Sequence, residues 1–269
     1  GVAIILVVLF HAFARWPNLT PYGDEYAGFF ITQYGWVGVE LFFIISGFVI
    51  FMTLEKSSNI MVFMYKRWLR LFPAMLIASV FIYITAPFFY ERPAGQPTWL
   101  SLIPGLTFIN PSIFKLILKI EIKPLEGAFW SLYIEMFFYL IAACAYFVMG
   151  KFKTLLLLIS LFLTASVAAY FTNSNGFLHK SIMYFPFVYF GWFAAGATLY
   201  LYTQNNQKNM LLLGAVLLVL SSISTSTLIL AGLPALLLVS VFFLASLKLA
   251  FIQKLLSCKI LVFVGYISY

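Results

Sequence analysis

Long apolar runs alternate with short polar segments along almost the whole chain. A helix needs roughly 20 mostly apolar residues to cross a bilayer, so runs near this length predict membrane-spanning helices. The pattern therefore predicts an all-α, polytopic bundle of transmembrane helices with eight or nine spans. We expect these spans at residues 1–14, 36–54, 73–90, 129–149, 154–172, 182–202, 210–225 and 228–247, with a ninth beginning near Ile260.

The polar sequence SSISTST at residues 221–227 separates the expected seventh and eighth spans. Such a run marks a loop between two helices, or it lines the interface where one helix packs against others. The sequence leaves both interpretations open.

The longest polar segment, residues 91–128, contains the sequence SIFKLILKIEIK at residues 112–123. This stretch is too short and too charged to span a bilayer, and it predicts a short interfacial or re-entrant helix. No second domain is indicated, so residues 1–269 are expected to form a single transmembrane domain. Because apolar runs stand at both ends, we expect this domain to be truncated at both ends.

Composition supports a membrane protein. Hydrophobic residues make up 64% of the chain and charged residues 9%, against about 25% charged residues in soluble domains. The net charge of +8 is read as a topology signal and not as a sign of nucleic-acid binding, because Lys and Arg stand in short loops. If the first helix runs outward, ten of the 16 basic residues lie inside and six outside, which places segment 91–128 outside.

Three ionisable residues stand within the expected spans. An ionisable group at this depth costs about 2.5–3.5 kcal/mol on insertion scales, which favours a functional role. Counting 1.5 Å per residue from the helix ends puts His11 and Glu40 about 5 Å below the outer edge of the hydrocarbon, with Glu135 slightly deeper. We expect the three to converge; a hydrogen-bonded interface histidine and structural ion pairs are the alternatives.

A basic group, Lys66, Arg67 and Arg70, precedes the expected third span. Two arginines three residues apart share a helix face, and guanidinium groups bind phosphate bidentately. The sequence therefore predicts a phosphate clamp at the cytoplasmic mouth of the helix. An ordinary positive-inside cluster is the alternative interpretation.

The same positions carry a family resemblance. The segments HAF, GWVGVELFFIISGFVI, YKRWLRLFP and WSLYIEMFFYL, in this order up to about Leu140, resemble the signature segments of the membrane acyltransferase 3 family. Members of this family include bacterial O-acetylases of surface glycans, with about ten spans. The resemblance implies a catalytic histidine, two acidic positions and an R-x-x-R pair at His11, Glu40, Glu135, Arg67 and Arg70.

The resemblance implies an O-acyltransferase of the inner (cytoplasmic) membrane that moves an acyl group, acetyl by expectation, from cytosolic acyl-CoA to a carbohydrate hydroxyl outside. His11 would act as general base or acyl carrier, and Glu40 or Glu135 would fix its tautomer. Arg67, Arg70 and Lys66 would hold the phosphates of the coenzyme, which is a donor substrate, and no metal is expected. The acceptor would be a glycan or a lipid-linked sugar.

Other classes of protein place His and Glu at membrane depth too. A proton-coupled transporter would move its substrate across intact. A protein that handles glycolipids would use the basic pair for headgroups, and a polytopic scaffold would use the ionisable residues only to pair with one another.

Overall fold

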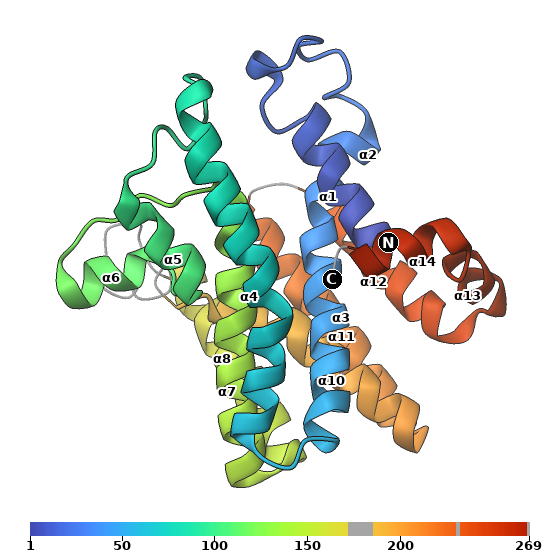
Figure 1. Cartoon of the computed structure of the whole chain (residues 1–269). Coiled ribbons are helices and arrows are strands. Elements are labelled where there is room, and N and C mark those ends of the chain that lie inside the picture. Colours follow the sequence, from blue (N-terminus) through green and yellow to red (C-terminus); the bar gives the residue numbers. More distant parts are fainter. Residues whose placement is uncertain (172–184, 230–231, 268–269) are drawn as a thin grey trace. The chain divides into compact units, whose positions relative to one another are not determined.

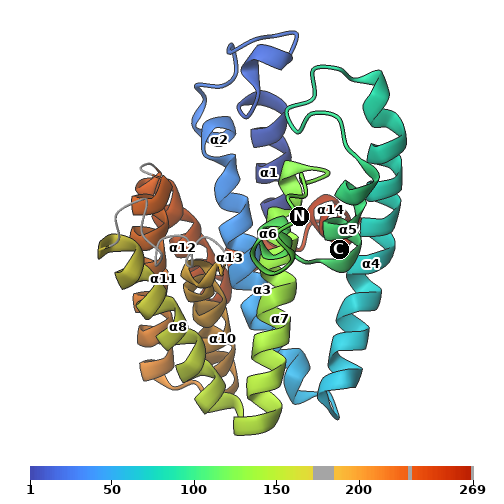
Figure 2. The same ribbon diagram turned by 90° about the vertical axis from the view of Figure 1, so that its left-hand side faces the viewer.

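The computed structural model describes residues 1–171, 185–229 and 232–267, and within these residues the chain is all-α, without strands. The predicted fold class is therefore confirmed. The helices (Figures 1 and 2) are α1 Val2–Phe13, α2 Phe30–Gln33, α3 Gly38–Glu55, α4 Ile60–Thr85, α5 Leu102–Thr107, α6 Pro111–Leu118, α7 Trp130–Met149, α8 Lys151–Phe171, α10 Phe190–Asn205, α11 Lys208–Ile229, α12 Leu233–Lys248, α13 Ala250–Leu256 and α14 Lys259–Ile267.

Five of the described helical segments are long and apolar enough to cross a membrane: Gly35–Glu55, Ile60–Phe88, Gly127–Met149, Lys151–Phe171 and Lys208–Thr227. Two sharply bent pairs, Trp99–Thr107 with Pro111–Leu118 and Leu233–Lys248 with Ala250–Leu256, each form a broken span or a re-entrant loop. Helix α1 is apolar but shorter. The chain is a multi-pass membrane protein; the expected start of one span at Ile182 lies outside the described residues.

Helix α4 begins at Ile60, so the third span starts well before the predicted boundary at Pro73. Asn59 caps the helix by accepting a hydrogen bond from the backbone nitrogen of Val62 at 2.9 Å. Pro73 lies inside the helix, where it removes one backbone hydrogen bond and crowds the carbonyl of Leu69, and membrane helices tolerate this. The basic residues expected in front of the span therefore lie within it.

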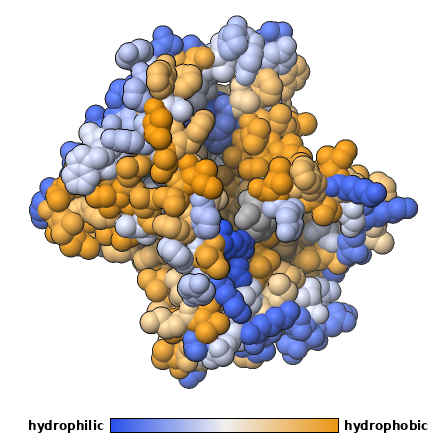
Figure 3. Space-filling model, viewed as in Figure 1, coloured by the Kyte–Doolittle hydropathy of each residue, from blue (hydrophilic) through white to orange (hydrophobic). Residues whose placement is uncertain are grey.

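The surface of α4 is strongly apolar. Only 17% of the most apolar stretch of the segment Ile60–Phe88 is buried, so most of this stretch is available to lipid. Figure 3 shows broad apolar areas on the face that carries α4. The exposed apolar side chains of this helix include Met61, Leu69, Ile77, Val80, Phe81 and Ile84.

The polar run 221–227 lies inside α11 and does not form a loop. Ser221, Ser222 and Thr225 are fully buried, and the indole nitrogen of Trp192 on α10 donates to Thr225 Oγ1 at 3.0 Å. Similar contacts join Ser224 to Ser166 on α8 at 2.9 Å and Ser222 to Ser240 on α12 at 3.4 Å. The run lines a helix interface, as the second interpretation holds, because hydroxyl groups in lipid need partners on neighbouring helices.

The chain forms two compact units. Unit 1 consists of Gly1–Met52, Leu155–Ser166 and Phe187–Tyr269, and unit 2 consists of Thr53–Thr154 and Val167–Pro186. Each unit is described by itself below.

In unit 1, glycines allow α3 to approach two other helices closely. A Cβ atom at Gly47 would lie 2.0 Å from the carbonyl oxygen of Phe193 on α10, and one at Gly196 would lie 2.0 Å from that of Ile44 on α3. Close approach through small residues is a general way to pack membrane helices, because lipid gives no hydrophobic driving force between them. Gly38, at the start of α3, meets α1 in the same way.

In unit 2, α4 and α7 pack side by side in opposite directions. Phe63, near the start of α4, meets Tyr139 in the middle of α7, with ring centroids 6.3 Å apart. Further along α4, Met75 packs with Phe129 and Tyr133 at the start of α7. This register fixes which residues of the two helices stand level.

The segment 91–128 contains two short helices, α5 and α6, that are bent by 106° relative to each other. A helix therefore forms within the predicted stretch, and its interfacial or re-entrant position in the membrane stays a prediction. Helix α6 ends at Leu118, earlier than the predicted 123, because Lys119 takes a left-handed conformation (φ 58°).

Candidate functional site

The side chain of Arg67 is buried in unit 2, with only 6% of the residue exposed. Its Nη2 donates to Oγ1 of Thr53, in the last turn of α3, at 2.5 Å. Its guanidinium carbon lies 5.5 Å from the ring centroid of Phe63 and 5.8 Å from that of Tyr139. A cation over aromatic faces in a desolvated place is worth up to about 2 kcal/mol, so the structure holds this charge in a fixed position.

Glu135 belongs to the surroundings of Arg67. The hydroxyl of Tyr139 donates to Oε1 of Glu135, one turn earlier on α7. The antiparallel register of α4 and α7 sets Glu135 level with the α4 turn that contains Arg67 and Arg70. The predicted grouping of Glu135 with His11 and Glu40 stays a prediction, because Glu135 belongs to unit 2 and the other two residues belong to unit 1.

The other two basic residues of α4 differ from Arg67 in accessibility. Arg70 is half-buried and Lys66 is exposed. Arg67 and Arg70 share a helix face through their three-residue spacing. The predicted basic group therefore consists of one buried guanidinium, one at the edge and one exposed ammonium.

Helix α3 carries polar groups at both ends. It is 18 residues long, about 27 Å at 1.5 Å per residue. Glu40 stands in its first turn, and Thr53, which contacts Arg67, stands in its last. Thirteen residues, about 20 Å of helix, separate the two, so the opening acidic motif and the contact to the arginine lie at opposite ends of one helix.

Glu40 is buried in unit 1, with 2% of the residue exposed. Its Oε2 is buried and has no hydrogen-bond partner within the described part of the chain. Phe43, one turn further along α3, contacts Tyr189 and Phe193 with ring centroids 5.7 and 4.7 Å apart. A buried carboxyl oxygen without a partner is costly, so Glu40 is a candidate site residue.

His11 is exposed, and its Nδ1 lies 2.9 Å from the carbonyl oxygen of Val7. Since a carbonyl only accepts, Nδ1 carries the proton and Nε2 is left as the basic nitrogen. The backbone thus provides the tautomer-fixing contact that the sequence assigned to Glu40 or Glu135.

His11 and Glu40 do not stand at one depth. The start of α3 runs antiparallel to α1, with Gly38 against Ala3 and Val7. Glu40 follows Gly38 by two residues, so this antiparallel register sets Glu40 level with about Ala3. Ala3 precedes His11 by eight residues, which is about 12 Å along α1. The expected equal depth assumed that both helix ends are level, whereas the two helices are staggered.

The structure adds two residues that were not predicted as site members. The sequence does not distinguish Thr53 from other residues, because a single threonine near the end of an apolar run is common. Tyr139 supplies a ring to Arg67 and a hydroxyl to Glu135. Its spacing of four residues from Glu135 was the available hint, since such pairs share a helix face.

Two cavities adjoin Tyr133 at the start of α7. The first, of about 180 Å³, is mainly apolar and is lined by residues such as Met64, Phe108, Ile134, Phe137 and Leu140. The second, of about 370 Å³, is a groove lined by polar residues of segment 110–130. Tyr133 lines both.

Fold and site together define a multi-pass helical membrane protein that holds ionisable side chains within its spans. The sequence model of the acyltransferase 3 family, described as an acyltransferase domain, matches residues 1–269, and the chain belongs to this family. A search of curated proteins and of solved structures found no match.

Proposed function

We propose that this protein is an O-acyltransferase of the cytoplasmic membrane that moves an acyl group, acetyl by expectation, from cytosolic acyl-CoA to a hydroxyl of a carbohydrate outside. Membership of the acyltransferase 3 family supports the class of reaction. The observation that supports transfer from one side of the membrane to the other is the arrangement along α3, with buried Glu40 at one end and the Thr53–Arg67 contact at the other.

The donor would bind at the end of α3 where Thr53 fixes Arg67. Arg70 and Lys66, which are more accessible, would meet the phosphates first, and the guanidinium of Arg67 would bind a phosphate oxygen deeper in the helix pair. The rings of Phe63 and Tyr139 keep Arg67 in place, so little side-chain entropy is lost when the donor binds.

The donor would have to extend about 32 Å along the helix axes to bring its thioester to His11, about 20 Å from Thr53 to Glu40 and about 12 Å from Glu40 to His11. His11 Nε2 would take the proton from the acceptor hydroxyl while the oxygen of that hydroxyl forms a bond to the thioester carbon. The carbon–sulfur bond then breaks, and the proton on the imidazolium passes to the leaving thiolate. Glu40, whose buried oxygen lacks a partner, would bind a hydroxyl of the acceptor.

The test uses vesicles that contain the full chain, with radiolabelled acetyl-CoA supplied only on the cytosolic side. We expect label in an externally accessible glycan fraction, and loss of transfer in His11→Ala. If labelled sugar crosses intact without gaining an acyl group, the protein is a transporter and the proposal is wrong. Full transfer by His11→Ala would remove the base assignment.

A second pair of variants tests the donor site. Arg70→Ala and Lys66→Ala should raise the KM for acetyl-CoA, because they remove accessible charge from the phosphates. Lys56→Ala, in the loop before α4, is the matched control and should leave this KM unchanged. Equal KM values in all three would contradict the phosphate assignment.

A further inference from the structure

A groove in unit 2 with a mixed polar and apolar lining lies between α6 and the start of α7. It has a volume of about 370 Å³ and is lined by Asn110, Lys115, Glu121, Glu126, Trp130 and Tyr133, among others. This volume lies within the roughly 300–1,000 Å³ range of small-molecule sites. None of these six residues belongs to the donor site or to the transfer step described above.

Tyr133 is the strongest sign that the groove receives a ligand. The residue is only 5% exposed, and its hydroxyl has no hydrogen-bond partner within the described part of the chain. Buried tyrosine hydroxyls usually find a partner. Tyr133 lines the groove, and a shift of the groove wall would bring its buried hydroxyl into contact with a ligand that enters there.

The walls of the groove are pre-organised by contacts of their own. Lys115 Nζ pairs with Glu121 Oε1 at 2.8 Å, and Asn110 accepts from the backbone nitrogen of Ser112 at 2.9 Å. Glu126 accepts from the nitrogen of Gly127 at 2.8 Å. The contacts of Asn110 and Glu126 hold these groups before any ligand arrives, whereas the Lys115–Glu121 pair is exposed and holds its side chains only weakly.

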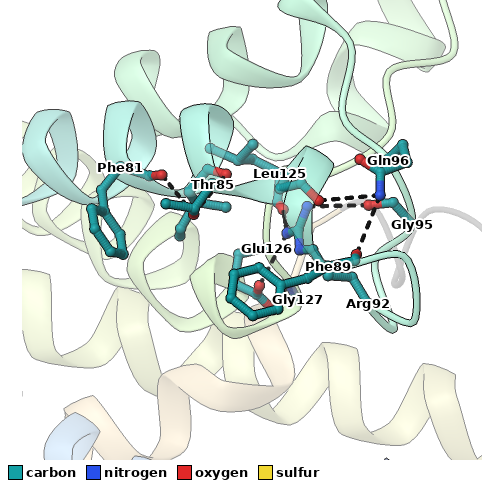
Figure 4. A network of polar contacts seen from close by, with 11 residues as sticks. Phe81, Thr85, Phe89, Arg92, Gly95, Gln96, Leu125, Glu126 and Gly127 are labelled. Atoms are coloured by element: carbon teal, nitrogen blue, oxygen red, sulfur yellow. Dashed lines mark hydrogen bonds and ion pairs between the residues drawn. The ribbon is translucent and has the colours of Figure 1, made fainter.

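Arg92 anchors the Glu126 side of the groove from a distant part of the loop. Figure 4 shows its guanidinium between the turn at Gly95 and the segment at Leu125 and Glu126. Nη2 donates to the carbonyl of Leu125 at 2.8 Å and pairs with Glu126 Oε2 at 3.4 Å, while Nη1 donates to the carbonyl of Gly95 at 3.1 Å.

The charge of the groove favours a neutral ligand. Lys115 is balanced by Glu121, and Glu126 is balanced by Arg92. Carboxylates and an amide oxygen accept hydrogen bonds, whereas an ammonium and a phenol donate them. A ligand rich in hydroxyl groups, each a donor and an acceptor, matches this mixture better than an anion or a cation.

Trp130 adds a flat apolar surface at the same place. It is 37% exposed, and it stands one turn before Tyr133 on α7. An exposed indole beside polar groups suits a ligand with an apolar face and polar edges, which is the shape of a pyranose ring. We propose that this groove binds a neutral sugar unit and is the acceptor subsite of the transferase, an inference that rests on the proposed function.

The test measures binding of neutral oligosaccharides (chitohexaose, maltohexaose and cellohexaose) to the full chain in lipid nanodiscs by calorimetry. We expect at least one to bind. Trp130→Ala should weaken that binding by about tenfold or more, and Tyr133→Phe by roughly threefold to tenfold. Tyr133→Phe keeps the packed ring, so loss of folding does not confuse the result.

Trp99→Ala is the matched control, since Trp99 is also exposed but does not line the groove; it should bind as the wild type does. If no oligosaccharide binds the wild type, or if Trp130→Ala and Tyr133→Phe bind with unchanged affinity, the inference is overturned. Hydrolysis of acetyl-CoA in the same samples reports on the donor side. Sugar binding without any acyl transfer would contradict the proposed function and leave the groove assignment standing.

Discussion

Arg67 on α4 donates a hydrogen bond of 2.5 Å to Thr53 in the last turn of α3. The two residues are 14 positions apart and belong to helices joined by a short loop. A buried guanidinium stays charged, so its burial is costly unless its donors find partners. This contact therefore fixes the most buried cation of α4 and offers the first point at which the site can be tested.

Replacement of Thr53 by valine should destabilise the protein and weaken donor binding. The hydroxyl that accepts from Arg67 is lost while the shape is kept, and a hydrogen bond to a charged group contributes about 1.5–3 kcal/mol. Thermal unfolding in detergent and the KM for acetyl-CoA measure the effect. Thr85→Val is the control, because Thr85 bonds only to carbonyls of its own helix; an equal loss in both variants would contradict a special role for Thr53.

Tyr139 contributes a ring to Arg67 and a hydroxyl to Glu135, and two variants separate these contacts. Tyr139→Phe keeps the ring and should cost about 1 kcal/mol of stability, with little change in the KM for the donor. Tyr139→Leu also removes the aromatic face, worth up to about 2 kcal/mol, and should raise this KM. Equal KM values in the two variants would show that the ring does not position Arg67.

Gly47→Ala should disrupt the packing of α3 against α10. Its Cβ would lie 2.0 Å from a backbone oxygen of Phe193, and a backbone gives way less easily than a side chain. We expect destabilisation of about 3 kcal/mol or more, at the upper end of overpacking, measured as a lower Tm. Gly28→Ala, with nothing near its Cβ position, should leave the Tm unchanged.

The contact of His11 Nδ1 with the Val7 carbonyl predicts one tautomer. In ¹⁵N NMR of histidine-labelled protein, Nδ1 should give the shift of a protonated nitrogen and Nε2 that of an unprotonated one at neutral to alkaline pH. His179→Gln leaves His11 as the remaining signal of the two histidines. The opposite assignment would remove Nε2 as the base.

The ion pair at the rim of the groove predicts a dependence on acid. Lys115 donates a hydrogen bond to Glu121 and attracts its charge, and this lowers the pKa of Glu121 below its ordinary 4.5. A carboxyl with a depressed folded pKa stabilises the fold above its unfolded pKa, and the contribution is lost as pH falls through the folded value.

We therefore expect pepsin to cleave the loop at residues 119–126 faster as the pH is lowered below about 4.5. Because the activity of pepsin itself changes with pH, each rate is compared with that of Glu121→Gln, and the ratio of wild-type to variant cleavage should rise as the pH falls. Because both side chains are exposed, 1 M salt should reduce the difference between the two proteins. A wild type without this acid dependence would contradict the role of the pair.

Much of the fold was predictable from hydropathy, since a long apolar run in lipid must form a helix to satisfy its backbone. Residues 36–54 and 129–149 match the spans Gly35–Glu55 and Gly127–Met149 within two residues. The start of α4 was not predictable in this way, because its first turns mix basic and apolar residues and its interior contains Pro73. Because α4 begins at Ile60, Arg67 and Arg70 lie in a helix and not in the loop that the hydropathy pattern predicts.

The sequence by itself determined that this is an all-α membrane protein, which of its residues are ionisable at depth, and which family its motifs resemble. These follow from the order of residues along each helix. Only the tertiary structure decided that Arg67 is held by Thr53 and two aromatic rings, that Glu135 bonds to Tyr139, and that serines of α11 face other helices. The physical reason is that hydropathy describes each helix against lipid, whereas partners are chosen by rotation, stagger and close approach between helices distant in sequence.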